Sequence, residues 1–263
     1  MIRLPMENPF PGAPIYFKKK TGSTMEDARR LFLMGCSDGT VVLTAFQERG
    51  RGRLTDRSWS AEEGKNLLLT VVLRAPGGVG GSAGAPPQRL PLIAGLALAM
   101  SVERLYSLPV QLKWPNDLLV EGKKVAGILC EALTEGGSLG VLIGFGVNCN
   151  QVSFPQNLEH KAISLSRILG RDVDLLVILG ELLKVLRATL DDSDWKNKAE
   201  QRLYGLGREV FLQAPQPGGS LREERGVIRG LNSDGSLLFQ SAGRLEVISL
   251  YTGEIRFISD ESS

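Results

Sequence analysis

The sequence predicts an α+β protein: a mixed, largely antiparallel sheet with flanking helices, followed by a small C-terminal β-barrel. Four strand-like apolar runs lie between residues 110 and 147, and several of their connections are too short for a crossover helix, so these pairs should be antiparallel. After residue 205 the pattern changes to short strands separated by turns. We therefore predict two domains, residues 1–204 and residues 205–263.

The N-terminal part should contain one helix and two buried strands. Residues 1–22 are predicted to be an extended lead-in. The spacing of Ser23, Thr24 and Glu26 is that of a capping box, which predicts a helix that begins here and ends at Gly35. The other elements predicted in this part are strands at residues 41–46 and 66–74, with a long loop at 47–65 between them.

Two long helices follow in the central part. Residues 90–108 carry apolar side chains on all sides, as does a helix buried against a sheet. Residues 175–190 have the pattern of an amphipathic helix, with Asp174 as its N-cap. The glycine- and proline-rich residues 76–88 should be mobile. The remaining predicted elements are strands at 110–114, 118–120, 125–133 and 139–147, a turn at 121–123, a helix near 195–204, and short strands around 210, 226–229, 237–240, 245–250 and 255–258.

The composition is that of an ordinary globular protein, with 43% hydrophobic and 23% charged residues. The net charge of +2 argues against a protein that coats nucleic acid, so any cationic function must be local. Three scattered cysteines indicate buried thiols in a reducing compartment, and a single histidine excludes a histidine-rich metal cluster. We see neither a signal peptide nor 18 uninterrupted apolar residues, which predicts a cytoplasmic protein without a membrane span.

Residues 47–57 (QERGRGRLTDR) form a cationic, glycine-rich loop with four arginines against two acidic residues. Glycines let backbone N–H groups approach an anion, and arginine binds phosphate or carboxylate through paired hydrogen bonds. Trp59 could cover the face of an adenine ring. A solvated basic loop or an RNA-contacting segment has a similar composition, so the loop alone leaves these interpretations open.

Residues 113–117 (KWPND) combine a lysine, an aromatic ring, a carboxamide and a carboxylate at the end of a predicted strand. This combination suits a site that neutralises phosphate, binds a carboxylate and holds an aromatic ligand. A short hairpin should bring Lys124 back toward Asp117, and such a pair near phosphate would be a sensible catalytic unit. The alternative is a plain strand end and turn, with a surface salt bridge worth about 0–1 kcal/mol.

Two common nucleotide-binding motifs are missing from the sequence. Residues 144–150 (GFGVNCN) contain a G-x-G that no helix follows, so this is not a dinucleotide-binding fingerprint, and there is no P-loop motif. Asn148 and Asn150 could contact a base or shape a turn. Ser23 and Thr24 are first of all candidate helix caps, and contact with a polar ligand is the second possibility.

Taken in order along the chain, these motifs resemble those of the biotin protein ligases, the biotin–[acetyl-CoA-carboxylase] ligases. The resemblance covers the chain from Ile15 to Ile258, and the pair KWPND and KVAGIL (residues 124–129) is its most specific part. It implies a class II synthetase-like catalytic domain and an SH3-like C-terminal barrel. The other matching residues are Ser23, Thr24, Gln47, residues 50–53 (GRGR), Trp59, Glu131, Gly144, Gly146 and Asn148.

The resemblance implies a two-step ligation that uses ATP and biotin. The biotin carboxylate attacks the α-phosphate of ATP, which gives biotinyl-5′-AMP and pyrophosphate. The ε-amine of one lysine on a biotin carboxyl carrier domain then attacks this mixed anhydride and releases AMP. Both steps concentrate negative charge between carboxylate and phosphate, so fixed cations should dominate catalysis. Mg²⁺ is expected with the ATP.

The resemblance also implies roles for individual residues. Arg51 and Lys124 match the positions that hold the biotin carboxyl group and the α-phosphate, and Asp117 is the candidate for steering or deprotonating the acceptor lysine. The predicted biotin-binding residues are Ser23, Thr24, Gln47, Gly50, Arg51, Lys124 and Gly127, and the predicted adenylate-binding residues are Arg53, Trp59, Asn116, Lys124 and Asn148.

The chain departs from the family pattern near its arginine loop. Trp59 lies one residue further from the loop than expected, and Ser60-Ala61 stands where the family often has a serine two residues after the tryptophan. Only 22 residues precede Ser23, too few for the DNA-binding winged helix of some members. We therefore predict a ligase without a DNA-binding domain, either a monomer or a homodimer, whose partner is the carrier domain of a carboxylase.

Two alternatives remain at this point. A lipoate or octanoate ligase of the same fold would transfer an apolar acyl chain, and the biotin motifs disfavour it. A nucleic-acid-binding module built on the arginine loop and the barrel is disfavoured by the near-zero net charge and by the 6% aromatic content. Such a module would show salt-dependent binding of DNA or RNA.

Overall fold

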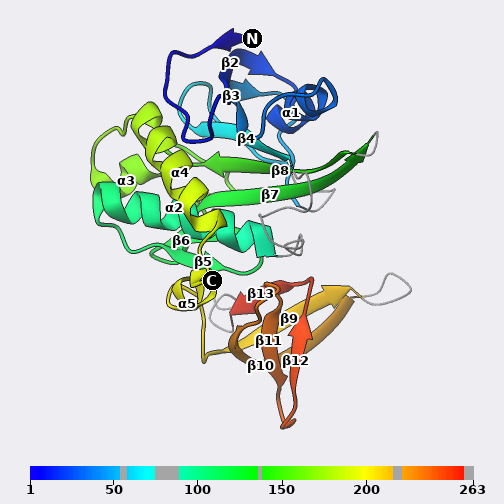
Figure 1. Ribbon diagram of the computed structural model, residues 1–263. Helices are drawn as coiled ribbons and strands as arrows, with labels where there is room; N and C mark the ends of the chain where they lie inside the picture. Colours follow the sequence, from blue (N-terminus) through cyan, green and yellow to red (C-terminus); the bar gives the residue numbers. More distant parts are fainter. Residues whose placement is uncertain (54–57, 75–88, 136–137, 216–220, 258–263) are drawn as a thin grey trace.

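The computed structural model describes residues 1–53, 58–74, 89–135, 138–215 and 221–257. Two β-sheets dominate these residues. Figure 1 shows the larger sheet with its helices above the smaller, C-terminal sheet. The predicted mobile segment at 76–88, and Asp56 and Arg57 of the predicted arginine loop, lie outside the described residues.

The larger sheet has the strand order β1-β2-β3-β4-β8-β7-β6-β5. Only the β2–β3 pair is parallel among the described strands, so the predicted α+β class with a largely antiparallel sheet is confirmed. The four strands predicted between residues 110 and 147 are β5 to β8. The strands are β1 (Ile2–Arg3), β2 (Ile15–Thr21), β3 (Thr40–Gln47), β4 (Leu67–Arg74), β5 (Gln111–Lys113), β6 (Asp117–Val120), β7 (Lys123–Glu135) and β8 (Ser138–Val147).

The extended lead-in predicted for residues 1–22 is wrong in part, because it contains β1 and β2. Strand β2 is parallel to β3, and helix α1 (Thr24–Leu33) makes the crossover between them. Three consecutive lysines, residues 18–20, come just before the last residue of this strand and interrupt its apolar pattern in the sequence. Strand β1 pairs only with Tyr16 and Phe17, so among the described residues the lysine-containing half of β2 lies at the edge of the sheet, where lysines oppose pairing with other chains.

Helix α1 begins after Ser23 as predicted, but the predicted capping box does not form. Ser23 has an extended backbone and its side chain makes no capping hydrogen bond. The first helical N–H group, that of Thr24, donates instead to Oε1 of Gln47 at 2.8 Å. The Gln47 side chain of β3 therefore accepts a hydrogen bond from an N–H group that has no partner within the helix. The predicted helix end is confirmed by Gly35, whose φ of +79° is typical of a C-terminal glycine.

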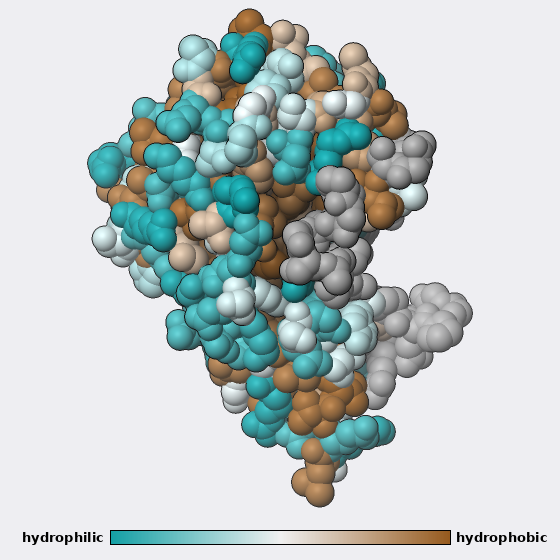
Figure 2. Space-filling view, in the orientation of Figure 1, coloured by the Kyte–Doolittle hydropathy of each residue, from teal (hydrophilic) through white to brown (hydrophobic). Residues whose placement is uncertain are grey.

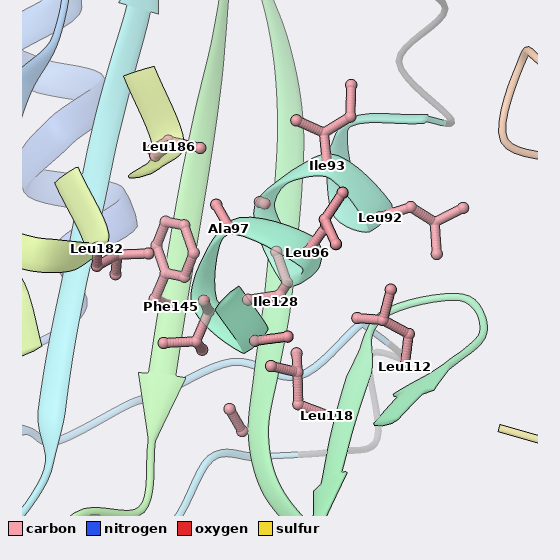
Figure 3. Packing of buried hydrophobic residues seen from close by; sticks show 14 of the residues in the cluster. Leu92, Ile93, Leu96, Ala97, Leu112, Leu118, Ile128, Phe145, Leu182 and Leu186 are labelled. Carbon is pink, nitrogen blue, oxygen red and sulfur yellow. The ribbon is translucent and has the colours of Figure 1, made fainter. Parts of the chain in front are cut away.

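Two apolar layers cover the faces of the larger sheet. Helix α1 packs on one face. The opposite face is covered by α2 (Leu90–Tyr106), on which α4 (Leu175–Leu190) packs. Figure 3 shows Leu96 of α2, Ile128 and Phe145 of the sheet, and Leu182 of α4 in this second layer. Because residues alternate between the faces of a strand, polar groups on the α1 face can be exposed while this layer stays buried.

The helix predictions hold except at two short elements. Asp174 caps α4 by accepting hydrogen bonds from the backbone N–H groups of Leu176 and Val177, at 2.8 and 3.3 Å. Helix α5 (Trp195–Glu200) ends before the predicted residue 204, because Leu112 of β5 pairs with the backbone of residues 202–204. Helix α3 (Leu165–Leu169) was not predicted, and its five residues are too few to show a periodic pattern.

The C-terminal sheet is antiparallel throughout, with the order β12-β11-β10-β9-β13. Its first strand begins four residues after the predicted domain boundary, and the division into two domains stays a prediction. The strands are β9 (Glu209–Pro215), β10 (Leu221–Leu231), β11 (Leu237–Ser241), β12 (Val247–Leu250) and β13 (Glu254–Phe257).

Hydrophilic residues predominate on the face of the molecule seen in Figure 2, and apolar residues reach this surface in smaller groups. Within the described parts of the chain, no helix has the length and apolar character that a membrane crossing requires. The apolar side chains of α1 and α2 pack against the larger sheet.

Burial of Cys149 makes the stability of the fold sensitive to alkaline pH. Burial raises the pKa of this thiol from 9.0 to about 12. Between pH 9.0 and about 12 the Cys149 thiol therefore loses its proton in the unfolded chain but keeps it in the folded chain. Because the unfolded state binds fewer protons, the free energy of unfolding declines over this range. We expect Cys149→Ala to weaken the decline, as measured by urea denaturation on both sides of pH 9.0.

Cys36→Ala is the matched control, because this thiol is only half-buried and should account for less of the decline. An equal alkaline decline in the wild type and in Cys149→Ala would contradict the assignment.

Candidate functional site

Two glycines on neighbouring strands form a flat surface on the α1 face of the sheet. Gly127 of β7 lies directly opposite Gly146 of β8. The indole of Trp59 lies on both: a Cβ added at Gly146 would be 2.5 Å from Trp59 Cε2, and one at Gly127 would be 3.1 Å from Cζ3. We call Gly127 and Gly146 the glycine floor. Only glycines leave room for an aromatic ring here.

Trp59 lies two residues beyond the arginine loop and is tied to the beginning of that loop by backbone contacts. The backbone N–H of Trp59 donates to the carbonyl of Gly50 at 2.9 Å, and Arg51 forms a β-bridge with Ser58. A Cβ at Gly50 would be 2.7 Å from the Trp59 carbonyl oxygen, so a glycine is needed there as well. Apart from this bridge, the described residues between β3 and β4 contain no strand or helix, which confirms the predicted loop in those residues.

The predicted approach of Lys124 to Asp117 is confirmed. Strands β6 and β7 form a hairpin whose turn has positive φ at Glu121 and Gly122. The ammonium Nζ of Lys124 lies 2.6 Å from Asp117 Oδ1 and 5.5 Å from the centre of the Trp59 ring. The pair therefore stands at the edge of the glycine floor, with about a third of each side chain exposed.

The backbone of Lys124 is fixed from two sides. Its N–H donates to the carbonyl of Lys161 at 2.8 Å, and its carbonyl accepts from the N–H of Ile163 at 3.0 Å. The amide Nδ2 of Asn148 also donates to this carbonyl, at 3.3 Å, and Asn148 is almost fully buried. The predicted adenylate residue Asn148 thus lies beneath Lys124, where it positions the lysine backbone.

Asn116 plays a similar part in the next strand pair. Its Nδ2 donates to the carbonyl of Ile128 at 2.8 Å, while the Ile128 N–H donates to the carbonyl of Asn116 at 2.9 Å. The short segment before β6 is therefore fastened to β7. In both Asn116 and Asn148 the amide nitrogen is engaged with backbone, and Oδ1 is the atom with acceptor capacity.

The structure corrects the interpretation of Trp114 as a ring that could hold an aromatic ligand. Trp114 is 3% exposed, and its Nε1–H donates to the carbonyl of Gly235 in the C-terminal sheet at 3.2 Å. The aromatic ring at the glycine floor is that of Trp59. The sequence could not separate these two roles, because Trp114 contacts a residue that follows it by 121 positions.

Neutral polar groups gather where α1 begins. Oε1 of Gln47 accepts from the backbone N–H and from the hydroxyl of Thr24, at 2.8 and 3.0 Å. The hydroxyl of Thr70 in turn donates to that of Thr24 at 2.9 Å. Ser23 is 1% exposed beside them. The structure thus brings together Ser23, Thr24 and Gln47 as predicted, and adds Thr70, which in the sequence is one residue in an unbroken apolar strand.

Sequence reasoning also missed the role of Glu131, although it lies in the recognised motif. One carboxylate oxygen lies 3.1 Å from Arg51 Nη2, and the other lies 3.2 Å from Arg29 Nη2 on α1. The signal was available, because Glu131 is four residues after Gly127 on β7 and so lies on the same face. Arg53 takes a different direction and donates to the carbonyl of Gly253 in the C-terminal sheet at 3.1 Å.

The assembled site is an apolar aromatic surface with cations and carboxylates along one side and neutral hydrogen-bonding groups at the start of α1. Such an arrangement can hold a ligand that has a polar uncharged head and an anionic end. The Nε1 of Trp59 is buried without a hydrogen-bond partner among the described residues, and buried polar atoms of this kind are uncommon. In the same residues, no group of three or more His, Cys, Asp or Glu side chains could hold a metal ion.

The glycine floor can be tested through the position of Trp59. We expect Gly146→Ala to displace the indole, because the added Cβ would be 2.5 Å from it, and to increase quenching of the tryptophan fluorescence by acrylamide. Trp114 and Trp195 are 3% and 5% exposed and should contribute little to the change. Gly127→Ala is the graded control, because its closest approach to the indole is 3.1 Å. Equal quenching in the three proteins would rule out the contact.

Comparison with known proteins places this site in a family. Residues 16–148 match the biotin/lipoate A/B protein ligase family. The chain is 32% identical to the biotin–[acetyl-CoA-carboxylase] ligase of Mycobacterium tuberculosis, over 88% of this chain and 84% of that protein. It is 29% identical to the bifunctional ligase/repressor BirA of Bacillus spizizenii, over 97% of this chain and 77% of that protein.

A solved structure shows the same fold. The biotin protein ligase of Aquifex aeolicus in complex with biotin and ATP is 29% identical, with a TM-score of 0.74 over 92% of this chain and 97% of that one. The family match covers the arginine loop, the KWPND segment, Lys124 and the glycine floor. The chain belongs to the biotin/lipoate A/B protein ligase family.

Proposed function

We propose that this protein joins biotin to a lysine of a biotin carboxyl carrier domain, with ATP as the energy source. In the first step a biotin carboxylate oxygen bonds to the α-phosphorus of ATP, and the bond to pyrophosphate breaks. In the second step the acceptor amine bonds to the carboxyl carbon of biotinyl-5′-AMP, loses a proton, and AMP leaves. The observation that carries the proposal is the Lys124–Asp117 pair at the edge of the glycine floor beneath Trp59.

Lys124 and Arg51 supply the positive charge that both steps need. Charge develops on the oxygens between carboxylate and phosphate, and fixed cations stabilise it without reorganisation. Each cation already faces a carboxylate, Asp117 for Lys124 and Glu131 for Arg51. An incoming anion would therefore enter positions where a negative charge is held in the unliganded protein.

The polar groups at the start of α1 suit the uncharged head group of biotin. A ureido ring offers N–H donors and a carbonyl acceptor, so it needs neutral partners of both kinds. Ser23, Thr24 and Gln47 supply hydroxyl and amide groups, with the backbone of Gly50 and Gly127 nearby as further contacts. The ring system and acyl chain would lie beside the Trp59 indole that covers the glycine floor, and the Nε1–H of Trp59, which has no partner among the described residues, would donate to this ligand.

For the adenylate we propose Arg53, Trp59, Asn116 and Asn148. The amide nitrogens of the two asparagines are used on backbone carbonyls, so their acceptor oxygens would meet the exocyclic amine of adenine. Asp117 would then steer or deprotonate the acceptor lysine. Mg²⁺ would arrive with ATP, held mainly by phosphate oxygens and water, as is usual for this ion.

The acceptor we propose is the carrier domain of acetyl-CoA carboxylase or a related carboxylase. Relatives from Mycobacterium tuberculosis and Paracoccus denitrificans are named as ligases for acetyl-CoA carboxylase, which supports this choice. The family itself includes lipoate ligases, so lipoate or octanoate is the alternative acid.

The deciding experiment measures pyrophosphate release from ATP with biotin, with lipoate, or with no acid, followed by transfer of label to a carrier domain. Release that depends on biotin, with transfer to one lysine, is the expected result. Release that depends on lipoate would favour the alternative. The absence of release with any acid, in folded protein, would refute the proposal.

Lys124→Ala tests the proposed cation. We expect kcat/KM for adenylate formation to fall by about 10²- to 10³-fold, as when a group that stabilises transition-state charge is removed. The melting temperature should change little, because a partly exposed ion pair contributes about 0–1 kcal/mol. Lys123→Ala, in the same hairpin, is the control and should keep its activity. Undiminished adenylation in Lys124→Ala would exclude the assigned role.

Arg53→Gly tests whether the loop retains the reactive intermediate. Loss of the contact with the Gly253 carbonyl should loosen the loop and release biotinyl-5′-AMP, which would then label lysines of bystander proteins. Mass spectrometry of an added bystander protein measures this labelling. Arg49→Gly is the control, because Arg49 is 75% exposed and faces Glu26 at the surface. If Arg53→Gly labels bystanders no more than the control does, the loop is not the barrier.

A further inference from the structure

Trp114 is the one aromatic residue of the KWPND segment, and the ligand contacts proposed above do not use it. It is 3% exposed, and its indole N–H is engaged with Gly235 at 3.2 Å. A residue so enclosed cannot reach a ligand bound beside the glycine floor. Its place in the chain is nevertheless close to the site, two residues before Asn116 and three before Asp117.

Two turns of the C-terminal sheet hold the Trp114 indole. The turn between β10 and β11 presents the carbonyl of Gly235, whose φ is +89°. The turn before β13 presents Gly253, and a Cβ added there would be 3.7 Å from Trp114 Cζ3 and 3.1 Å from the carbonyl oxygen of Gln213. Gly235 and Gly253 both adopt positive φ, +89° and +150°, a backbone conformation that favours glycine at these turns.

The Gly235 turn is also wedged against the start of α2. A Cβ at Gly235 would be 2.6 Å from the Cα of Arg89 and 3.0 Å from its Cβ. This backbone cannot move closer to α2 unless the helix shifts. The position of the Gly235 carbonyl, and with it that of the Trp114 indole, is therefore set by two elements, the C-terminal sheet and α2.

On its other side, Trp114 is connected to the reacting groups through a short and rigid stretch of chain. Asn116 is fastened to Ile128 by two hydrogen bonds of 2.8 and 2.9 Å, and Asp117 holds Lys124 at 2.6 Å. The Gly253 carbonyl meanwhile accepts from Arg53 of the arginine loop. The same turn of the C-terminal sheet thus contacts both sequence segments that supply the proposed catalytic groups.

We propose that Trp114 is a positioning residue, through which the C-terminal sheet sets the position of Asn116 and Asp117 relative to Lys124. It acts on the rate of the chemical steps and not on the binding of biotin. This inference rests on the proposed function, because it concerns the same reaction. A displacement of reacting groups by about 1 Å can cost up to roughly a hundredfold in rate.

The test compares Trp114→Phe with Trp195→Phe, since Trp195 is 5% exposed and lies in α5 outside the proposed site. For each we would measure the melting temperature, the KM for biotin and the kcat of adenylate formation well below the melting transition. We expect Trp114→Phe to lose about tenfold in kcat with an unchanged KM for biotin. Trp195→Phe should keep kcat, whatever stability it loses.

A second pair of variants covers the case in which Trp114→Phe does not fold. Gly235→Ala and Gly243→Ala both place a side chain at positive φ, at +89° and +74°, but only the first meets other atoms within 4 Å. The Gly235 variant should show the loss of kcat and the Gly243 variant should not.

The outcomes separate the inference from the function on which it rests. If the wild-type protein forms no adenylate with biotin, the proposed function fails. Suppose instead that the wild-type protein is active. If Trp114→Phe or Gly235→Ala then retains kcat, or if its KM for biotin changes by as large a factor as its kcat, Trp114 has no positioning role.

Discussion

The site depends on one row of the sheet. In the antiparallel register of β6, β7 and β8, Asp117 pairs with Gly127, and Gly127 pairs with Gly146. Because side chains alternate between faces, a slip of one residue would turn this row toward the opposite layer and bury the carboxylate against α2. The row also explains Gly127: a Cβ there would be 3.2 Å from Nζ of Lys124, which reaches across the glycine to Asp117.

The charged groups around this row form ion pairs that can be broken at a small cost in free energy. Lys124 with Asp117, and Arg51 with Glu131, are only partly buried, so each pair contributes about 0–1 kcal/mol. A ligand that brings its own carboxylate or phosphate can compete for these cations without leaving a buried charge alone. In the proposed complex, Arg29 would stay beside Glu131 if Arg51 turned to the ligand, so the carboxylate would keep a partner.

The C-terminal sheet contributes to the site without supplying a proposed catalytic group. Two glycine turns reach the larger sheet, one at the carbonyl that accepts from Trp114 and one at the carbonyl that accepts from Arg53. Backbone carbonyls on short turns are well suited to this task, because they have few internal degrees of freedom to lose. The position of Arg53 and the geometry of the β6–β7 hairpin are therefore linked to the packing of this second sheet.

The sequence by itself determined the elements with strong local signals. It gave correct positions for α2 and α4 and for the hairpin that returns Lys124 to Asp117, since apolar periodicity, an Asp cap and a turn across Glu121 and Gly122 are all encoded within a few residues. The motifs around these elements were also sufficient to indicate the family.

Only the tertiary structure decided the contacts between distant segments. Strand β2 pairs with β3, and Gln47, not Ser23, accepts the hydrogen bond from the first N–H group of α1. Trp114 contacts the C-terminal sheet, whereas Trp59 lies on the glycine floor. The physical reason is that each of these contacts joins residues far apart in the chain, so its energy depends on the packing of whole elements. Local residue patterns carry no record of that packing.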